Sequence, residues 1–367
     1  MQIAIFHNLE PGGALVELSK ITKILISYGH NIDLYSLNHN LQATVQNKLV
    51  YIPSKPTNLL GHLKQAVFEL NSLQKKQANI IDQGQYDLVL VFPCIVTQSP
   101  HILRHLKHKL VLYFFAEPKR EFYENVSFEY HKVSRLISRT IRRIIQIIDL
   151  INCKTAKYII ANSQYSLHYL KKVYKQKGYV IYPGKKDSRP HLVRIKTHPK
   201  QQVLSVGLHS KIKGHDFSIR QIYNIAKLNI LGTQTNESKH LFQISSHNSM
   251  NIRYIYTKNN SKKISLYQKH NVFLANQTNE PFGLTTLEAC TYNNLVLGKN
   301  LGGTPEIVRH GLNGFLYPPD LKLARKILKS TIYHQSIQLV KTSTISWKTT
   351  VDHILSLYHQ LKHEPTE

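Results

Sequence analysis

The chain has 367 residues, of which 42% are hydrophobic, so two globular domains are expected rather than one. Its 48 lysines and arginines against 21 aspartates and glutamates give a formal net charge of +27. That charge favours an anionic partner. Nucleic acid, an anionic lipid surface and a phosphorylated substrate all fit, and the charge alone does not choose among them. The apolar runs are too short to span a bilayer, and the first residues lack a signal-peptide pattern, so we expect a soluble or peripheral protein.

Short apolar runs alternate with helical patterns through the first half of the chain, which is typical of parallel βα units. Strands are predicted at 3–6, 32–36, 87–92, 110–115, 157–161 and 180–184, and the first helix at 14–28. Ligands bind beyond the carboxyl ends of strands in doubly wound sheets. The loop 116–124 is therefore a candidate ligand site, whereas the glycine pair Gly12 and Gly13 by itself indicates only a tight turn.

The stretch 131–150 predicts a basic amphipathic helix, with Arg135, Arg139, Arg142 and Arg143 at helical spacing beside an apolar side. One interpretation is a helix packed in the core with a solvated basic face. Another is a helix whose arginines contact the headgroups of an anionic membrane surface. A DNA-binding helix is a third, but no nucleic-acid-binding module accompanies it.

In the second half, the polar stretch 185–200 holds two prolines and is predicted to be an interdomain linker. Strands are then expected at 202–206, 228–231 and 272–275, and a polar loop with at most a short helix at 233–251. The segment 264–267 is predicted to be helical. Two further helices are predicted at 321–329 and 346–362.

The strand at 272–275 is followed by a Pro-Phe-Gly turn and a helix from Leu284. The first N–H groups of that helix, at Gly283, Leu284 and Thr285, form a natural anion site suited to a diphosphate. A carboxylate one turn into the helix, Glu288, suits a ribose diol, and Glu280 would lie beyond the phosphates, where a sugar would be. The alternative is a capped surface helix with incidental glutamates.

Three segments together resemble a known family. They are EPFGLTTLEA with its E-x7-E spacing, GGTPEIV at 302–308 and GLNGFL at 311–316, and they are similar to the retaining GT-B glycosyltransferases of family 4. The resemblance implies an α/β fold with two Rossmann-like, doubly wound domains facing a cleft. The expected division is 1–184 for the acceptor-side domain, 185–200 for the linker and 201–345 for the nucleotide-sugar-binding domain, with a helix in 346–367 packing back on the first domain.

The resemblance also implies roles for individual residues. Glu280 is expected at the catalytic centre, where it orients the hydroxyls of the donor sugar, and Glu288 is expected to bind the ribose. The other residues expected to bind the donor are Gly13, Lys213, Phe282, Gly283, Leu284 and Thr285. The acceptor-side candidates are Gly12, Glu117 and Arg120, of which Arg120 could serve an anionic acceptor or be a solvated charge.

Two positions depart from the family pattern. Leu208 stands where the family has an arginine that grips the diphosphate, and Ala116 where many members have a histidine. His209 or Lys211 could replace the missing arginine. Two hypotheses follow: an active retaining glycosyltransferase, or a GT-B-shaped protein with weak or lost catalysis that still binds nucleotide sugars. A nucleic-acid binder, suggested by the charge alone, is a third.

The active enzyme is the favoured hypothesis, since Glu280, Lys213 and Glu288 are all present. No Asp-x-Asp pair occurs, so a metal-independent reaction without a cofactor is expected, with a UDP- or GDP-sugar as donor. The expected acceptor is a lipid-linked or cell-envelope glycan, and nucleic acid is not expected to bind. Three scattered cysteines without zinc spacing indicate buried thiols in a reducing compartment, so we expect a cytoplasmic protein, peripheral at the inner face of the membrane.

Overall fold

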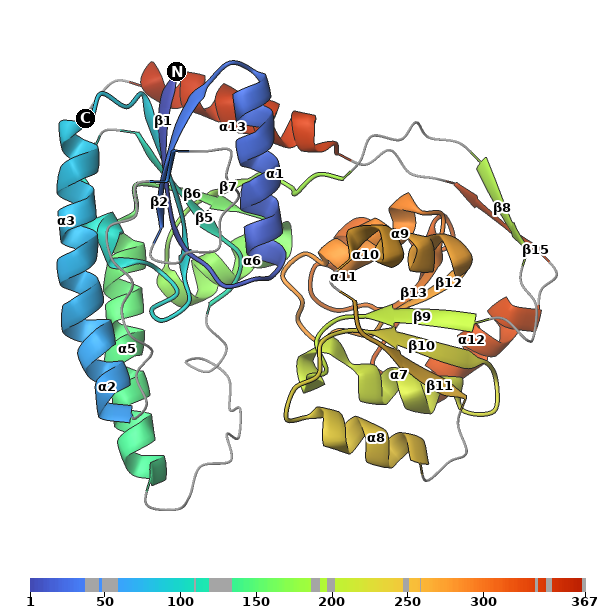
Figure 1. Ribbon diagram of the computed structural model, residues 1–367. Coiled ribbons are helices and arrows are strands. Elements are labelled where there is room, and N and C mark those ends of the chain that lie inside the picture. Colours follow the sequence, from blue (N-terminus) through green and yellow to red (C-terminus); the bar gives the residue numbers. More distant parts are fainter. Residues whose placement is uncertain are drawn as a thin grey trace. The chain divides into compact units, whose positions relative to one another are not determined.

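The structure is a computed structural model that describes residues 1–36, 46–47, 59–108, 110–118, 134–185, 192–196, 202–246, 251–257, 259–333, 336–340 and 345–364. The chain forms two compact units (Figure 1). Unit 1 contains Met1–Pro183 and Trp347–Glu367, and unit 2 contains Gly184–Ser346. Each unit is built on its own parallel sheet, as a pair of Rossmann-like domains requires.

Unit 1 is built on a seven-stranded parallel sheet in the order β3-β2-β1-β4-β5-β6-β7. Its strands are β1 (Gln2–Asn8), β2 (Asn31–Ser36), β3 (Gln46–Asn47), β4 (Leu88–Cys94), β5 (Val111–Phe115), β6 (Tyr158–Ala161) and β7 (Tyr179–Val180). Every strand predicted in this half is present. The central ones are buried on both faces, which explains their continuous apolar sequences.

Helices cover both faces of the unit 1 sheet (Figure 1). Ile3 and Ile5 of β1 face α1 (Gly13–Ser27) and α13 (Trp347–Lys362), whereas Ala4 and Phe6 face the other side. That other side is covered by α3 (Leu70–Gln83), α5 (Ser134–Thr155) and α6 (Gln164–Tyr169), with α2 (Leu59–Lys64) preceding α3. The alternation follows from the two-residue period of a strand.

The last helix packs on unit 1, as predicted. Val351, Ile354 and Leu357 of α13 are buried in the same core as Leu18 and Ile21 of α1. Thr350 donates from Oγ1 to the Tyr182 carbonyl at 2.9 Å, and Tyr28 donates from its hydroxyl to Asp352 at 3.0 Å. The end of the chain therefore completes the core of the unit in which the chain begins.

Glu17 is a carboxylate buried in the first turns of α1, 9% exposed, on the same side as the core residues Leu18 and Ile21. Burial raises the pKa of Glu17 from 4.5 to about 7, so the folded protein binds a proton that the unfolded chain releases. This contribution to stability is complete below pH 4.5 and is lost as the pH rises through 7.

We therefore expect the unfolding free energy of Glu17→Gln, relative to that of the wild type, to rise by about 3 kcal/mol when the pH is raised from 5 to 8. Glu10→Gln, at an exposed position of the same segment, is the matched control and should show no such gain. Urea unfolding at the two pH values measures the difference. An equal pH dependence in the wild type and Glu17→Gln would contradict it.

Unit 2 contains a six-stranded parallel sheet in the order β11-β10-β9-β12-β13-β14. Its strands are β9 (Gln202–Val206), β10 (Lys227–Leu231), β11 (Ile252–Ile255), β12 (Val272–Ala275), β13 (Leu295–Lys299) and β14 (Gly314–Tyr317). The helices are α7 (His215–Ile222), α8 (Ser238–Ser246), α9 (Asn260–Lys269), α10 (Leu284–Thr291), α11 (Thr304–Ile307) and α12 (Leu321–Tyr333). The predicted strands and helices of this half are confirmed.

One prediction in this half needs correction. The segment 185–200, predicted as a linker, contains strand β8 (Leu192–Lys196), which pairs antiparallel with β15 (Ser336–Val340). The segment is polar, and its partner strand lies far away in the sequence, so nothing in the local sequence indicated a strand. The stretch 233–251, predicted as a polar loop with at most a short helix, contains the nine-residue helix α8, of which Ser238 and Leu241 are the buried residues.

Candidate functional site

The turn between β12 and α10 forms as the sequence predicts. Gly283 precedes the helix with φ +106°, a left-handed conformation that glycine adopts without strain. Hydrogen bonding within the helix starts with the Leu287 N–H, which donates to the Gly283 carbonyl at 3.0 Å. The N–H groups of Leu284 and Thr285 come before that bond and have no partner inside the helix. The start of α10 is therefore a positively polarised end suited to an anion.

Two glycines pack against the backbone of this turn. The Gly303 N–H donates to the Glu280 carbonyl at 2.8 Å. A Cβ on Gly302 would lie 2.5 Å from the Glu280 carbonyl oxygen, and a Cβ on Gly303 would lie 2.5 Å from the Pro281 carbonyl oxygen. The close approach explains why this segment carries a glycine pair, and it fixes the backbone that presents Glu280.

A second loop, which follows β9, packs on the loop that follows β12. The Thr278 N–H donates to the Ile212 carbonyl at 2.8 Å, and a Cβ on Gly214 would lie only 2.0 Å from the Asn276 carbonyl oxygen. Strands β9 and β12 are neighbours in the sheet, so their carboxyl ends deliver both loops to one place. This backbone contact sets the separation of Lys213 and Glu280.

Lys213 and Glu280 form an ion pair. Lys213 Nζ lies 2.6 Å from Glu280 Oε2, and the two side chains are 24% and 17% exposed. They come from segments 67 residues apart in the chain. The structure thus brings together the cation predicted to bind the diphosphate and the carboxylate predicted to orient the sugar.

Glu288, on α10, is held by two residues of α9. Lys263 Nζ lies 2.8 Å from Glu288 Oε1 and 2.7 Å from Oε2, and the Tyr267 hydroxyl donates to Oε2 at 2.8 Å. Sequence reasoning missed both partners. The only signal was their spacing, because residues i and i+4 project from the same face of a helix.

The remaining residues predicted to bind the donor differ in accessibility. Phe282 is 5% exposed, so its ring is packed inside unit 2, whereas Leu284 and Thr285 are half-buried at the start of α10. Gly12 and Gly13 are exposed in unit 1, where Gly12 precedes α1 in an extended conformation. The donor-binding role of each remains a prediction.

The acceptor-side candidates are only partly described. The Glu117 carbonyl accepts a hydrogen bond from Gln98 Nε2 at 2.7 Å, and Glu117 is half-buried after the end of β5. Arg120 lies outside the described residues. The loop with Gly12 follows β1, and the loop with Glu117 follows β5. Both loops therefore follow strands of the same sheet.

Neither suggested replacement for the missing arginine is supported. His209 is 1% exposed, its Nδ1 lies 3.0 Å from Ser238 Oγ, and its ring contacts Phe242 and Tyr254. A histidine packed in this way cannot reach an external phosphate. The Lys211 side chain is exposed, and its backbone N–H donates to Glu237. Leu208 itself is 51% exposed and supplies no charge.

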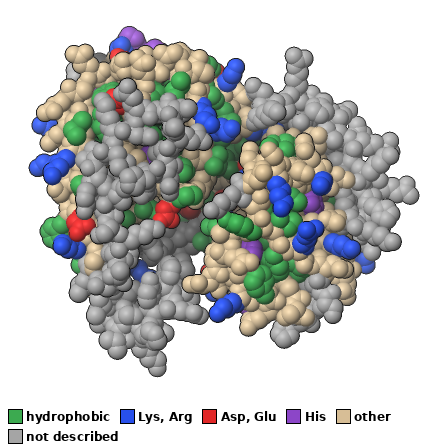
Figure 2. Space-filling view, viewed as in Figure 1, with side chains coloured by type: hydrophobic (Ala, Val, Ile, Leu, Met, Phe, Trp, Pro, Cys, Tyr) green, Lys and Arg blue, Asp and Glu red, His purple; other side chains and the backbone are tan. Residues whose placement is uncertain are grey.

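The helix α5 bears out the prediction of an amphipathic helix packed on the core. Ile141 and Ile145 are buried against Ala66, whereas Arg143 is exposed and donates to Gln146 Oε1 at 2.8 Å. The side chains of Arg135 and Arg139 lie outside the described part, and contact with a membrane remains a prediction. On the face drawn in Figure 2, the coloured lysine and arginine side chains are dispersed over both units rather than gathered in one stripe.

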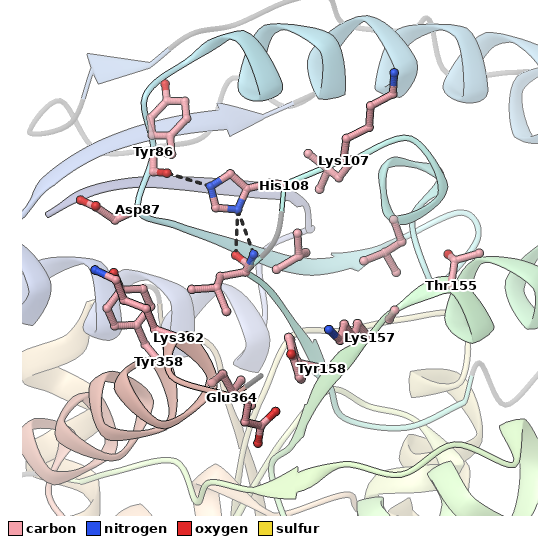
Figure 3. A pocket seen from close by; sticks show the side chains of 16 residues that line it. Tyr86, Asp87, Lys107, His108, Thr155, Lys157, Tyr158, Tyr358, Lys362 and Glu364 are labelled. Carbon is pink, nitrogen blue, oxygen red and sulfur yellow. Dashed lines mark hydrogen bonds between the residues drawn. The ribbon is translucent and has the colours of Figure 1, made fainter. Parts of the chain in front are cut away.

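Unit 1 also has a pocket of about 690 Å³ at the amino ends of β4, β5 and β6 (Figure 3). Its lining includes Tyr86, Lys107, His108, Lys157, Tyr158 and Tyr358. His108 Nε2 lies 2.7 Å from the Tyr86 carbonyl, which fixes the imidazole in the wall. Because the strands are parallel, this pocket lies at their amino ends, whereas Gly12 and Glu117 lie beyond their carboxyl ends. It contains none of the predicted site residues.

Within the described ranges, no group of three or more histidine, cysteine, aspartate and glutamate side chains is arranged to hold a metal ion. None of the helices in the described part of the chain combines the length and the apolar character needed to cross a membrane. Cys94, Cys153 and Cys290 are buried free thiols, as predicted, and burial raises the pKa of Cys290 to about 12.

Comparison with known proteins agrees with the fold. Residues 191–363 match the family model described as Glycosyl transferases group 1. A sucrose-phosphate synthase from Thermosynechococcus elongatus has a similar structure, with a TM-score of 0.71 and 16% identity over 99% of this chain and 100% of that one. The chain has the GT-B fold of these structures, and its residues 191–363 match the glycosyl transferases group 1 model.

Other similar proteins of this fold include WaaG, a glycosyltransferase involved in lipopolysaccharide biosynthesis, with a TM-score of 0.66 and 15% identity over 98% of this chain and 97% of WaaG. HepE from Anabaena, in complex with UDP-glucose, has a TM-score of 0.64 and 17% identity over 99% of this chain and 98% of that one. An uncharacterised 41.2 kDa protein from the cps region of Klebsiella pneumoniae is 27% identical over 183 residues, which span 46% of this chain and 50% of that protein.

Proposed function

We propose that this GT-B protein is a glycosyltransferase that transfers a sugar from a UDP-sugar to an acceptor hydroxyl, with retention at the anomeric carbon. The observation that carries the proposal is the convergence of three features in unit 2: the Lys213–Glu280 ion pair, the start of α10 and Glu288. A diphosphate needs positive groups, and a ribose and a sugar each need a hydrogen-bond acceptor. All of these groups occur in one part of unit 2.

The proposed roles follow from the chemistry of each group. Lys213 and the N–H groups of Leu284 and Thr285 neutralise the diphosphate, which leaves with the electron pair of the bond to the anomeric carbon. The acceptor hydroxyl attacks that carbon from the same face, and its proton passes to the leaving phosphate oxygen. Glu280 orients the hydroxyls of the sugar, and Glu288 accepts from the ribose. The positive groups of the protein then suffice without a metal ion.

A uridine nucleotide is proposed because HepE, a protein of the same fold, has been solved with UDP-glucose. The involvement of WaaG in lipopolysaccharide biosynthesis and the origin of the Klebsiella relative in a cps region support an acceptor of the cell envelope. A net charge of +27 suits an anionic, lipid-linked acceptor at the inner face of a membrane. We propose this location together with the acceptor.

A second candidate function is nucleotide-sugar binding with weak or lost catalysis. It is favoured by the exposed Leu208 at the position of an arginine, which leaves Lys213 as the cation contributed by this loop to the site. The two candidates predict the same binding and different turnover. Binding therefore tests the site, and turnover distinguishes the two functions.

Calorimetric titration with UDP, GDP and ADP tests the proposed site. We expect UDP to bind most tightly, and Lys213→Ala and Glu288→Ala each to weaken it at least about tenfold, because each removes a charged hydrogen-bond partner. Lys227→Ala removes the same charge from an exposed position at the amino end of β10, away from these loops, and should bind UDP as the wild type does. Equal loss in Lys227→Ala, or binding that is unchanged in both site variants, would place the nucleotide elsewhere.

A further inference from the structure

The carboxylate of Glu288 is more restrained than its position on a helix surface requires. Its side chain is 35% exposed, yet it is bonded by two separate groups of α9. Tyr267 is 1% exposed, and its hydroxyl also lies 3.4 Å from the Thr285 carbonyl, in the first turn of α10. One buried hydroxyl thus contacts both the helix end that would hold the diphosphate and the carboxylate that would hold the ribose.

Tyr267 can act only as a hydrogen-bond donor to Glu288. Burial, followed by the charge of Glu288, keeps the pKa of Tyr267 well above its usual value, so the hydroxyl remains protonated. Its ring is fixed between Phe273 and Tyr292, at centroid distances of 6.0 and 5.7 Å. The direction of the hydrogen bond to Glu288 is therefore set before any ligand binds.

The contacts limit how many further hydrogen bonds Glu288 can accept. A carboxylate has about four lone-pair positions, two on each oxygen. Tyr267 and Lys263 both approach Oε2, and Lys263 also approaches Oε1. Oε2 then has two partners within hydrogen-bond distance and Oε1 has one, which leaves Oε1 the more open oxygen.

We propose that Tyr267 and Lys263 are positioning residues that hold Glu288 with a single acceptor position, on Oε1, open to one ribose hydroxyl of the donor. The inference rests on the proposed function, since it assigns the ribose to Glu288. It adds that the site reads one of the two ribose hydroxyls and that α9 sets this selectivity. Lys263 and Tyr267 do not touch the donor themselves.

A purely structural role predicts a different result. If the two α9 residues only attached α9 to α10, their replacement would lower the stability of unit 2 and weaken all nucleotides equally. If the two residues position Glu288, their replacement weakens the binding only of nucleotides that carry the hydroxyl that Glu288 contacts. The ratio of affinities for UDP and its deoxy analogues separates the two roles, because a general loss of affinity cancels in the ratio.

The experiment compares UDP with 2′-deoxy-UDP and 3′-deoxy-UDP by calorimetry. In the wild type, we expect one analogue to bind about tenfold more weakly than UDP and the other to bind nearly as well, because one charged hydrogen bond is lost in one case only. In Tyr267→Phe and Lys263→Met, the tenfold ratio should fall to about threefold or less. Lys263 is half-exposed, so its replacement gives a folded variant if that of the buried Tyr267 does not.

Each variant has a matched control. Tyr292→Phe removes a hydroxyl from the ring stacked on Tyr267, and that hydroxyl makes no hydrogen bond to Glu288 in the described structure. Lys262→Met removes the exposed charge next to Lys263. Both controls should keep the ratio of the wild type.

The outcomes separate the inference from the function on which it rests. If Glu288→Gln abolishes the ratio and the two α9 variants keep it, Glu288 binds the ribose without their help and the inference is wrong. Equal weakening of both analogues in the wild type overturns the single acceptor position. If UDP does not bind, or Glu288→Gln keeps the ratio, the proposed assignment of the ribose to Glu288 is itself wrong.

Discussion

Glu280→Gln is expected to lower kcat for a UDP-sugar by about a hundredfold to a thousandfold, the usual effect of removing one preorganised electrostatic contact from a reacting centre. The amide keeps the size of the side chain and can still accept from Lys213 Nζ, 2.6 Å away in the wild type. The effect should therefore lie in turnover and not in folding. Steady-state release of UDP from the donor measures it.

The same variant provides its own control, because UDP lacks the sugar that Glu280 is proposed to orient. We expect Glu280→Gln to bind UDP within about threefold of the wild type, since no contact to the nucleotide is removed. A large loss of UDP affinity would show that Glu280 acts on the diphosphate or through Lys213. Unchanged turnover would remove Glu280 from the catalytic centre.

Gly214→Ala is expected to disrupt the site through the backbone. Gly214 has φ +66°, and a Cβ there would lie 2.0 Å from the Asn276 carbonyl oxygen, so the loops after β9 and β12 must separate. We expect a loss of about 3 kcal/mol in the unfolding free energy of unit 2 and no measurable UDP binding, because Lys213 and Glu280 no longer meet. Urea unfolding and calorimetry measure the two effects.

Gly311→Ala is the matched control for the collision. Gly311 has φ +79°, but a Cβ there would have no atom within 4 Å, so alanine introduces the same backbone strain without a clash. We expect a loss of about 1 kcal/mol and retained UDP binding. Equal effects in the two variants would mean that strain alone, and not the contact between the loops, explains the loss at Gly214.

Much of the fold was predictable because the central strands are buried on both faces. Continuous apolar runs such as 87–92 and 272–275 then mark strands, and the helical periodicity between them marks the covering helices. The strand β11 (Ile252–Ile255) was missed because it lies at the edge of its sheet and is only partly buried. The pair of β8 and β15 was missed because its partners are far apart in the sequence, so no local pattern reports the pairing.

The residues of the candidate site could be named from the sequence, but their contacts could not be predicted from it. Glu280, Glu288 and Lys213 were named from the resemblance to the family that the E-x7-E segment carries. The 2.6 Å contact between Lys213 and Glu280 depends on backbone packing between two loops, which residue spacing does not encode. Lys263 and Tyr267 belong to a helix without a recognised motif, and only packing of α9 beside α10 makes them partners of Glu288.

The most direct test of the central claim is the release of UDP from a panel of UDP-sugars by the wild type and by Glu280→Gln. The proposed function predicts that the wild type releases UDP from at least one UDP-sugar. It also predicts that the variant releases UDP more slowly, by a factor of about a hundred or more. Binding of UDP without release from any UDP-sugar in the presence of an acceptor extract would favour a protein that binds nucleotide sugars without turning them over. Equal release by both proteins would contradict the assigned catalytic centre.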